Sequence, residues 1–311
     1  MRSARSGSWR RRWLAIWLFT GMLTPGSALA LEVVVSIKPL HALVAFVMQG
    51  VGSPDLLLPG TVSEHTYALR PSDARMLSRA GLIFWGGAHL EGFLVRTLAN
   101  VATKAEKVAL LEVKEVTRLP MRSGGVWEEE EGHHDHDHGH GKDPHAWLDP
   151  RNAMAMGQAI AAALARLDPE RAERYHANAL ELSKRLQQLD QELADMLQPW
   201  QKVPYIVFHD AYQYFEQRYG MNAVGSFLVD PERPPTARRV AAIVQRMQQT
   251  QAVCLFTEPQ YSQRLTANVT SGHTIRTGVL DPLGAGLPAG PDLYFGLLKG
   301  LAHALAGCLR G

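Results

Sequence analysis

Histidine is the residue that most clearly suggests chemistry in this chain of 311 residues. Thirteen histidines are present, and five of them fall within eight positions, mixed with aspartate, in the tract HHDHDHGH. These five are His133, His134, His136, His138 and His140. Neutral imidazole is a common ligand of zinc, copper and nickel. We therefore expect the tract to contact divalent metal ions, through weak and multiple binding.

The tract belongs to a stretch of about residues 121–143 that is poor in apolar side chains and also contains four consecutive glutamates. Such a composition cannot bury enough apolar surface to fold, so we predict a disordered His/Asp/Glu-rich loop. A solvated loop without a metal role and an artificial tag are the alternatives. A tag would lie at a terminus, whereas this tract is internal and mixed with acids, which favours metal contact.

A tighter site needs histidines that the fold holds in place, and three of the eight outside the tract are candidates. His209 follows a predicted strand, so we expect it at the carboxyl end of that strand, where open α/β sheets form binding crevices. His65 lies in the loop after another predicted strand, and His145 lies between prolines in DPHAWLDP. A lone loop histidine is usually a surface residue, so position alone leaves these assignments open.

Strands that alternate with helices would position these side chains. In the first half we predict strands over 31–37, 51–58 and 82–85, and helices over 40–49 and 71–80. In the second half we predict strands over 203–208, 222–227, 252–257 and 274–280, and helices over 211–219, 235–249 and 291–309. This alternation indicates βαβ units. The predicted fold class is α/β with two lobes, each a mainly parallel sheet flanked by helices.

A long helix is predicted between the two halves. Residues 170–198 contain neither glycine nor proline and carry a stripe of leucines, and Pro199 follows. At 1.5 Å per residue, about 29 residues span roughly 43 Å, which is long enough to run along both lobes. We therefore assign an N-terminal lobe at 31–167, a rigid linker helix at 168–198 and a C-terminal lobe at 199–311. An ordinary long helix within one domain is the alternative.

The first 30 residues are typical of a cleavable export signal. Five arginines precede an apolar run over 13–23, and Ala28-Leu29-Ala30 follows as a small-residue cleavage site. The run is shorter than the about 20 residues that cross a bilayer, and no cysteine near the site could carry a lipid anchor. We expect a free periplasmic protein after removal of residues 1–30.

The net charge argues against a nucleic-acid partner. The whole chain has a formal charge of +2, and its first 30 residues carry five arginines and no acid. Removing them gives 2 − 5 = −3 for the mature chain. The basic character belongs to the targeting segment, so it does not indicate a surface for nucleic acid or for an anionic membrane.

The chain contains two cysteines. Cys254 lies in an apolar run typical of a strand, and Cys308 lies near the end of the last predicted helix. In an oxidising compartment the two can form one disulfide that joins this helix to the sheet. Two buried free thiols are the alternative.

Six segments resemble a known family in their order and spacing. They are SIKPLHALV at 36–44, SEHTYALRPSDARML at 63–77, the internal His/Asp/Glu loop, PHAWLDPRNA at 144–153, FHDAYQYFE at 208–216 and LDPLG at 280–284. Together they resemble the zinc-binding proteins of cluster A-I ABC importers, the ZnuA type, over essentially the whole mature chain. One segment alone would be a weak signal, whereas six in register are specific.

This resemblance implies a function. A monomer that is not an enzyme would capture Zn²⁺ in the periplasm and deliver it to an inner-membrane ABC permease driven by a cytoplasmic ATPase. Its metal would lie between two α/β lobes joined by a rigid helix, with His65, His145 and His209 as ligands. The family disulfide would correspond to Cys254 and Cys308. The histidine-rich loop would add low-affinity zinc binding or sensing.

The fourth ligand stays open at this point. Glu64, beside His65, or a water molecule is our first choice. Asp281 matches an acidic position of the family and is our second. Because zinc needs deprotonated imidazoles, affinity should fall as the pH drops through about 6.5.

Three other functions fit some of these features. A binding protein of the same fold could take manganese or another divalent metal, but three nitrogen ligands favour zinc over manganese. A zinc hydrolase could use three histidines and a water, with Glu64 as general base. No HExxH signature, nucleophile or oxyanion device is recognisable, which argues against it. An adhesin of the same fold is also compatible with the sequence.

Overall fold

The computed structural model describes residues 31–65, 67–122, 141–228, 235–262, 264–270 and 272–311. Residues 31–311 form one compact unit. The predicted export signal and the five histidines of the tract lie outside the described residues. Among the residues that are described, no helix is long and apolar enough to span a membrane.

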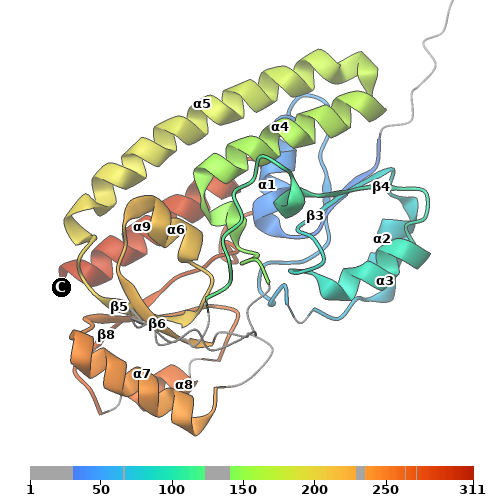
Figure 1. Cartoon of the computed structure of the whole chain (residues 1–311). Helices are drawn as coiled ribbons and strands as arrows, with labels where there is room; N and C mark the ends of the chain where they lie inside the picture. The colour runs from blue at the N-terminus through green and yellow to red at the C-terminus, as the bar shows by residue number, and fades with distance from the viewer. Residues whose placement is uncertain (1–30, 66, 123–140, 229–234, 263, 271) are drawn as a thin grey trace, which may run out of the picture. The chain divides into compact units, whose positions relative to one another are not determined.

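The first lobe is built on a parallel sheet of four short strands (Figure 1). The strands are β1 (Val33–Val35), β2 (Asp55–Leu56), β3 (Leu82–Trp85) and β4 (Glu106–Ala109), in the spatial order β2-β1-β3-β4. The connecting helices are α1 (Lys38–Val47), α2 (Pro71–Arg79) and α3 (Gly92–Asn100). The central strands consist of branched or aromatic residues that are buried on both faces, as expected for a parallel sheet covered by helices.

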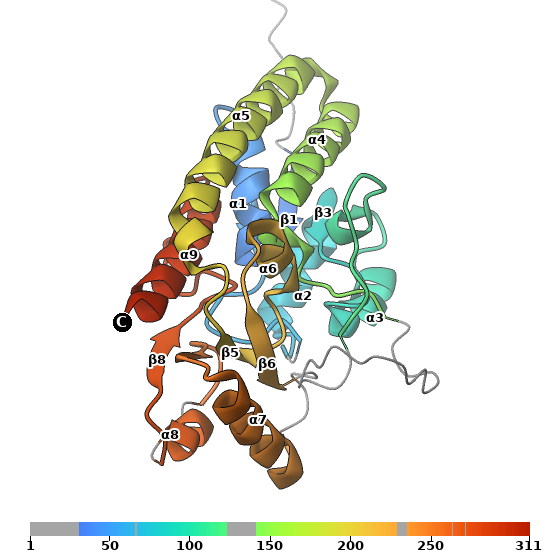
Figure 2. The same ribbon diagram turned by 60° about the vertical axis from the view of Figure 1, so that its left-hand side comes forward.

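The second lobe repeats this plan (Figure 2). Its strands are β5 (Tyr205–His209), β6 (Ala223–Leu228), β7 (Cys254–Thr257) and β8 (Arg276–Val279), all parallel and in the order β6-β5-β7-β8. Its helices are α6 (Gln213–Tyr219), α7 (Ala237–Thr250), α8 (Arg264–Thr270) and α9 (Leu293–Arg310). The predicted fold class, two lobes with mainly parallel sheets, is therefore confirmed.

Some elements were not predicted from the sequence. Strand β4 has the sequence EKVA, in which two charged residues replace the apolar run that marks the central strands β1, β3, β5 and β7. It can be so polar because it lies at the edge of the sheet and pairs with β3 alone. Helices α3 and α8 are only 9 and 7 residues long, too short to give a clear helical period. Strand β2 is also shorter than its predicted range of 51–58.

Two antiparallel helices connect the lobes. Helix α4 (Pro150–Leu167) begins where Asp149 accepts a hydrogen bond of 2.8 Å from the backbone N–H of Arg151, with proline at the first helical position. Helix α5 (Ala172–Leu197) lies within the range predicted for the linker helix. It packs along α4 and also contacts α1 of the first lobe and α9 of the second (Figure 1). The residue limits of the two lobes stay a prediction.

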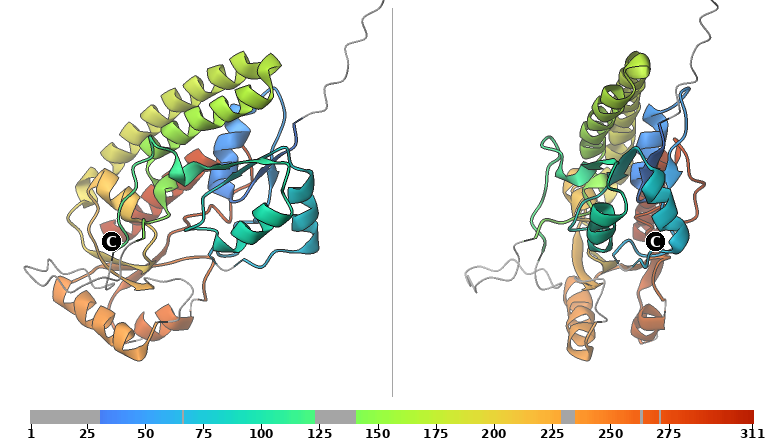
Figure 3. Two further views of the ribbon diagram at one scale, coloured as in Figure 1. Left: turned by 45° about the vertical axis from the view of Figure 1, so that its right-hand side comes forward. Right: turned by 90° about the vertical axis from the view of Figure 1, so that its right-hand side faces the viewer.

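One apolar core runs through both lobes. It joins residues of β1, β3 and α1 to residues of α4, α5, α9 and the second sheet. Along β5, Tyr205 and Val207 point into this shared core, whereas Ile206 and Phe208 point into a second, smaller core with α7. This alternation follows from the two-residue period of a strand. Helices α7 and α8 lie at the end of the second lobe away from α4 and α5 (Figure 3).

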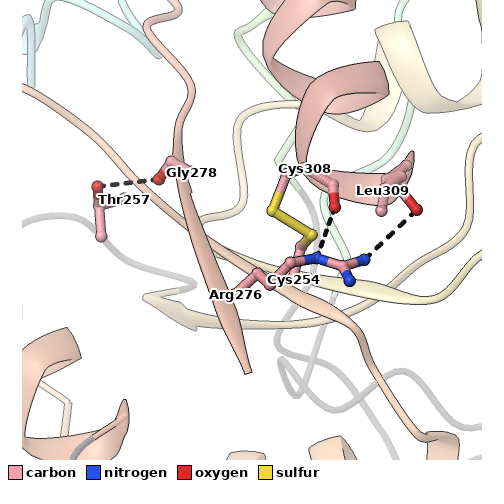
Figure 4. Close-up of a disulfide and its surroundings, with 6 residues drawn as sticks. All are labelled: Cys254, Thr257, Arg276, Gly278, Cys308 and Leu309. Carbon is pink, nitrogen blue, oxygen red and sulfur yellow. Dashed lines mark hydrogen bonds between the residues drawn. A yellow bond between two sulfur atoms is a disulfide. The ribbon is translucent and has the colours of Figure 1, made fainter. Parts of the chain in front are cut away.

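The two cysteines form a disulfide (Figure 4). It joins Cys254 on β7 to Cys308 on α9, with 6.2 Å between the Cα atoms, so the predicted link between the last helix and the sheet is confirmed. Arg276 on β8 donates from Nε to the carbonyl of Cys308 at 2.8 Å, and from its guanidinium to the carbonyl of Leu309 at 3.4 Å. These bonds satisfy carbonyl groups at the helix end that have no intrahelical partner.

Removing the disulfide should lower stability measurably. The bridge spans 54 residues, and closing a loop of that length stabilises a protein by about 4 kcal/mol in the chain-entropy model. We expect a Cys254→Ala/Cys308→Ala variant to lose about this free energy of unfolding in urea denaturation. Reducing the wild-type protein should have a similar effect, and adding reductant to the variant should change nothing. An unchanged midpoint after substitution would contradict the expectation.

Candidate metal centre

Three predicted side chains converge in the structure. His65 lies in the loop between β2 and α2, His145 immediately precedes a short 3-10 turn, and His209 is the last residue of β5. One donor atom from each lies within 4.8 Å of the other two. The ring centroids are 5.4 Å apart for His65 and His145, 5.4 Å for His65 and His209, and 4.9 Å for His145 and His209. Residues 144 positions apart in the sequence thus form one cluster.

The order of the strands explains the position of His209. Strand β5 lies between β6 and β7, so the connections leave β5 and β7 toward opposite sides of the sheet. At such a point the carboxyl ends of neighbouring strands leave a crevice, which is where open α/β sheets bind ligands. His209 ends β5, and Glu258 directly follows β7. The sheet therefore places an imidazole and a carboxyl group side by side.

The cluster contains polar atoms that lack a partner within the described part of the chain. There, the Nε2 of the buried His145 forms no hydrogen bond, and the buried Nε2 of His65 also forms none. Buried polar atoms in folded proteins are almost always paired, so these two nitrogens require an explanation. A cation bound between the rings would provide it.

The spacing of the donors suits a zinc ion after a small adjustment. Zinc lies about 2.0–2.1 Å from imidazole nitrogens in a tetrahedral site, which places the nitrogens about 3.4 Å apart. The three donor atoms here lie within 4.8 Å of one another. Closing on the ion would therefore shorten any of these separations by at most about 1.4 Å. Rotation of the side chains is sufficient for a change of this size.

His145 is held from its other ring nitrogen. Its Nδ1 lies 2.8 Å from Oδ1 of Asp143, and the same oxygen accepts the backbone N–H of His145 at 2.9 Å. The buried ring of Trp147 packs against the imidazole with 5.3 Å between centroids. A carboxylate on Nδ1 fixes the orientation of the ring and leaves Nε2 free to bind a metal. Asp143 was not singled out in the sequence, although it lies only two residues before His145.

The two candidates for the fourth ligand differ in their surroundings. Glu64 is buried, and its Oε1 has no hydrogen-bond partner among the residues that the structure describes. This oxygen lies 3.7 Å from Nε2 of His65. Asp281 instead accepts hydrogen bonds from Gln260 and from the backbone N–H groups of the turn that follows it, at Leu283, Gly284 and Ala285. Because both oxygens of Asp281 already have donors, the geometry favours Glu64 as a ligand.

Two further buried carboxyl groups near the cluster were missed in the sequence. One oxygen of Glu258 lies 3.6 Å from Nδ1 of His209, and the other forms no hydrogen bond with any described residue. Its position at the end of a predicted strand could have revealed it, by the argument that identified His209. Glu91 is fully buried and accepts the backbone N–H of Gly86 at 2.7 Å, just after β3. Its sequence context gives no comparable signal.

Burial and neighbouring charges set the protonation of the cluster. Burial lowers the pKa of His65 and of His145 well below the usual 6.5, and the nearby His209 adds to the effect. Burial would also lower the pKa of His209, but Glu258 and Glu64 outweigh it and raise the value. Burial raises the pKa of Glu64 to about 7. At neutral pH two of the imidazoles are therefore neutral, the form that binds metals.

Fold and cluster together define a two-lobed α/β protein with a buried three-histidine site able to hold a divalent metal ion. Residues 33–308 match the family described as ZnuA, the periplasmic component A of the zinc-uptake complex. The chain therefore belongs to the ZnuA family.

Known proteins resemble the chain along most of its length. It is 45% identical to the high-affinity zinc uptake system protein ZnuA of Brucella abortus, and the alignment covers 91% of this chain and 94% of that protein. Its fold is similar to a crystal structure of ZnuA with a TM-score of 0.77 and 24% identity, over 90% of this chain and 99% of the other. A ZnuA deletion mutant with zinc bound gives a TM-score of 0.76 and 25% identity, over 90% and 98%.

The metal-free cluster should titrate unevenly. Because the pKa of His65 and His145 lies well below 6.5 and that of His209 lies above it, His209 should keep its proton to higher pH than the other two. Nitrogen-15 NMR of the imidazoles between about pH 5 and about pH 8 would measure this. Single His→Ala variants would assign the signals. A charged His145 at about pH 6 would contradict the expectation.

Proposed function

We propose that this protein captures Zn²⁺ in the periplasm and delivers it to an inner-membrane ABC permease. His65, His145 and His209 bind the ion. The observation that carries the proposal is the convergence of three imidazoles. Those of His145 and His209 are buried and that of His65 is partly buried, and the Nε2 atoms of His65 and His145 have no hydrogen-bond partner among the described residues. The zinc-uptake relatives support the same function.

The composition of the site favours zinc. Three nitrogen donors and one carboxylate suit a borderline ion in a tetrahedral site, whereas manganese prefers more oxygen ligands. Glu64 completes the set, because its buried oxygen without a partner lies beside His65. The negative charge of Glu64 and of the carboxylates behind the rings, Asp143 and Glu258, offsets the charge of the ion.

The mechanism is capture and release without a chemical reaction. An ion bound by His65 and His145 from the first lobe and by His209 from the second connects the two lobes directly. Because the ion binds only the folded protein, it stabilises the fold by mass action. The linker helix at 168–198 limits the movement between the lobes at 31–167 and 199–311.

The signal segment and the histidine-rich loop serve export and the collection of zinc. Residues 1–30 direct the protein to the periplasm and are removed, and no lipid retains the mature monomer at a membrane. The loop at about 121–143 adds weak zinc sites that collect or sense the ion. The loaded protein then docks on the permease, whose cytoplasmic ATPase drives uptake.

Zinc binding should depend on the three histidines and persist without the loop. We expect a His65→Ala/His145→Ala/His209→Ala variant to bind zinc at least about 100-fold more weakly than the mature wild-type protein. Competitive chelator titration with metal analysis would measure the affinity and the number of ions. A variant that lacks residues 128–141 should keep one tightly bound ion and lose the weaker ones.

A control separates loss of the site from loss of the fold. A His89→Ala/His303→Ala variant removes two histidines outside the cluster and should bind zinc as the wild type does. If the triple variant kept one tightly bound ion while folded, the assigned site would be wrong.

The choice between Glu64 and Asp281 can be tested by two isosteric substitutions. We expect Glu64→Gln to weaken zinc binding by about 10-fold to 100-fold, because it removes a charged ligand. Asp281→Asn should act chiefly on thermal stability, because it weakens the hydrogen bonds of a turn. Zinc titration and thermal unfolding of the metal-free proteins would measure both effects. The reverse pattern would exchange the roles of the two residues.

A further inference from the structure

Two short segments form a ribbon close to the metal site. Residues 119–121, which Arg122 directly follows, pair in antiparallel fashion with residues 141–143. The backbone N–H of Met121 donates to Gly141 at 3.1 Å, and that of Asp143 donates to Leu119 at 2.9 Å. The ribbon therefore ends in Asp143, the residue that holds His145.

Arg122 joins this ribbon to the second lobe. Its Nε donates to the carboxylate of Asp210, with distances of 3.0 and 3.1 Å to the two oxygens, and an Nη2 hydrogen bond adds to this contact. Its Nη1 donates to Glu216 on α6 at 2.7 Å. Asp210 is the neighbour of His209 in the chain. One guanidinium thus connects the ribbon to the residue next to a metal ligand.

The opposite end of the ribbon is held by the same helix. Tyr214, which precedes Glu216 on α6, donates from its hydroxyl to the carbonyl of Asp143 at 2.8 Å and accepts the backbone N–H of Leu119 at 2.9 Å. Asp143 in turn contacts Nδ1 of His145 at 2.8 Å. An unbroken set of contacts therefore runs from His209 through Asp210, Arg122 and the ribbon to His145.

We propose that Arg122 is a positioning residue for the zinc site. It fixes the separation of His145 and His209 by joining Asp210 of the second lobe to the ribbon that ends in Asp143. This inference rests on the proposed function. A planar guanidinium can bind a carboxylate with two nitrogens and still reach a second acid, which a lysine ammonium cannot do with the same geometry. The proposed role therefore requires an arginine at position 122.

Charge explains why the contact is needed. Asp143, Asp210 and Glu216 are all buried, and the side chain of Arg122, which pairs with two of them, is itself only 19% exposed. Removing the cation would leave two buried carboxyl groups without their partner, which is strongly unfavourable. The local structure would relax by moving these groups apart or by admitting water. Either change would displace His209 relative to His145.

The test compares three substitutions. We expect Arg122→Gln to raise the zinc dissociation constant by at least about 10-fold, the effect typical of losing a group that orients a metal ligand. Arg122→Lys should recover part of the affinity, because it restores the charge without the planar fork. The matched control is Arg166→Gln, which breaks an exposed ion pair with Glu106 far from the cluster and should leave the affinity unchanged.

A spectroscopic measurement distinguishes positioning from stability. Co²⁺ bound in place of zinc reports the geometry of the donor set through its visible absorption, which a purely structural role of Arg122 would leave unchanged. We expect Arg122→Gln to shift or weaken this absorption and Arg166→Gln to match the wild type. Lower thermal stability of the metal-free Arg122→Gln protein, with the same zinc affinity and the same Co²⁺ spectrum, would overturn the inference.

A second variant tests the inference if Arg122→Gln does not fold. Glu216→Gln removes one partner of the guanidinium and leaves Asp210 in place; a loss of several-fold in zinc affinity supports the inference, and no loss overturns it. Failure of the proposed function gives a different result, because wild-type protein that bound no zinc, or a folded triple histidine variant that still bound it, would show that the cluster is not the metal site.

Discussion

The site depends on one physical feature: imidazole nitrogens are buried away from water without a hydrogen-bond partner among the described residues. Two of the three rings have a buried nitrogen that accepts no hydrogen bond from the described residues, and burial holds these rings in the neutral form. Such a cluster is costly until a cation occupies it, since each nitrogen has given up its bond to water. This unfavourable free energy of the metal-free site is relieved when the ion binds, and it therefore contributes to the affinity for the ion.

The fold meets this constraint by repeating one topology. Both sheets have their first strand beside their third, with the second strand on the outside and the fourth at the other edge. In the second lobe this order places His209 and Glu258 at the carboxyl ends of adjacent strands. The first lobe supplies its histidines from loops. Asp143 fixes the position of His145 by contacting both its backbone N–H and its Nδ1. The metal site is therefore formed by one strand end of the second sheet together with two loops of the first lobe.

Much of the fold could be predicted from local pattern. The alternation of strand-like and helix-like segments identified seven of the eight strands of the described residues. It was clearest at the central strands, because a buried parallel strand has little freedom in composition. Strand β4 was missed because an edge strand can be polar. The three histidines were chosen from eight in two steps. His65 and His209 follow predicted strands and His145 lies between prolines, and the resemblance to a family then assigned all three as ligands.

The groups around the histidines were harder to predict, and for a physical reason. Asp143 and Glu258 lie near recognisable elements, and a search for acids beside candidate ligands would have found them. Arg122 acts through contacts with residues distant in sequence, such as Asp210, which lies 88 positions away. No periodicity or motif encodes contacts of that kind. They become visible only when the chain is folded.

The two apolar cores imply two levels of cooperativity. The shared core links β1, α1, α4, α5, α9 and one face of the second sheet, so these parts must lose their packing together. The smaller core lies between the other face of that sheet and helices α7 and α8, and within the described part of the chain it shares no buried residue with the first. We therefore expect it to open locally without unfolding the rest. Amide hydrogens of α7 would then exchange through local opening, while those of α4 and α5 would exchange only when the whole chain unfolds. A ligand that joins the lobes would slow the second process and leave the first almost unaffected.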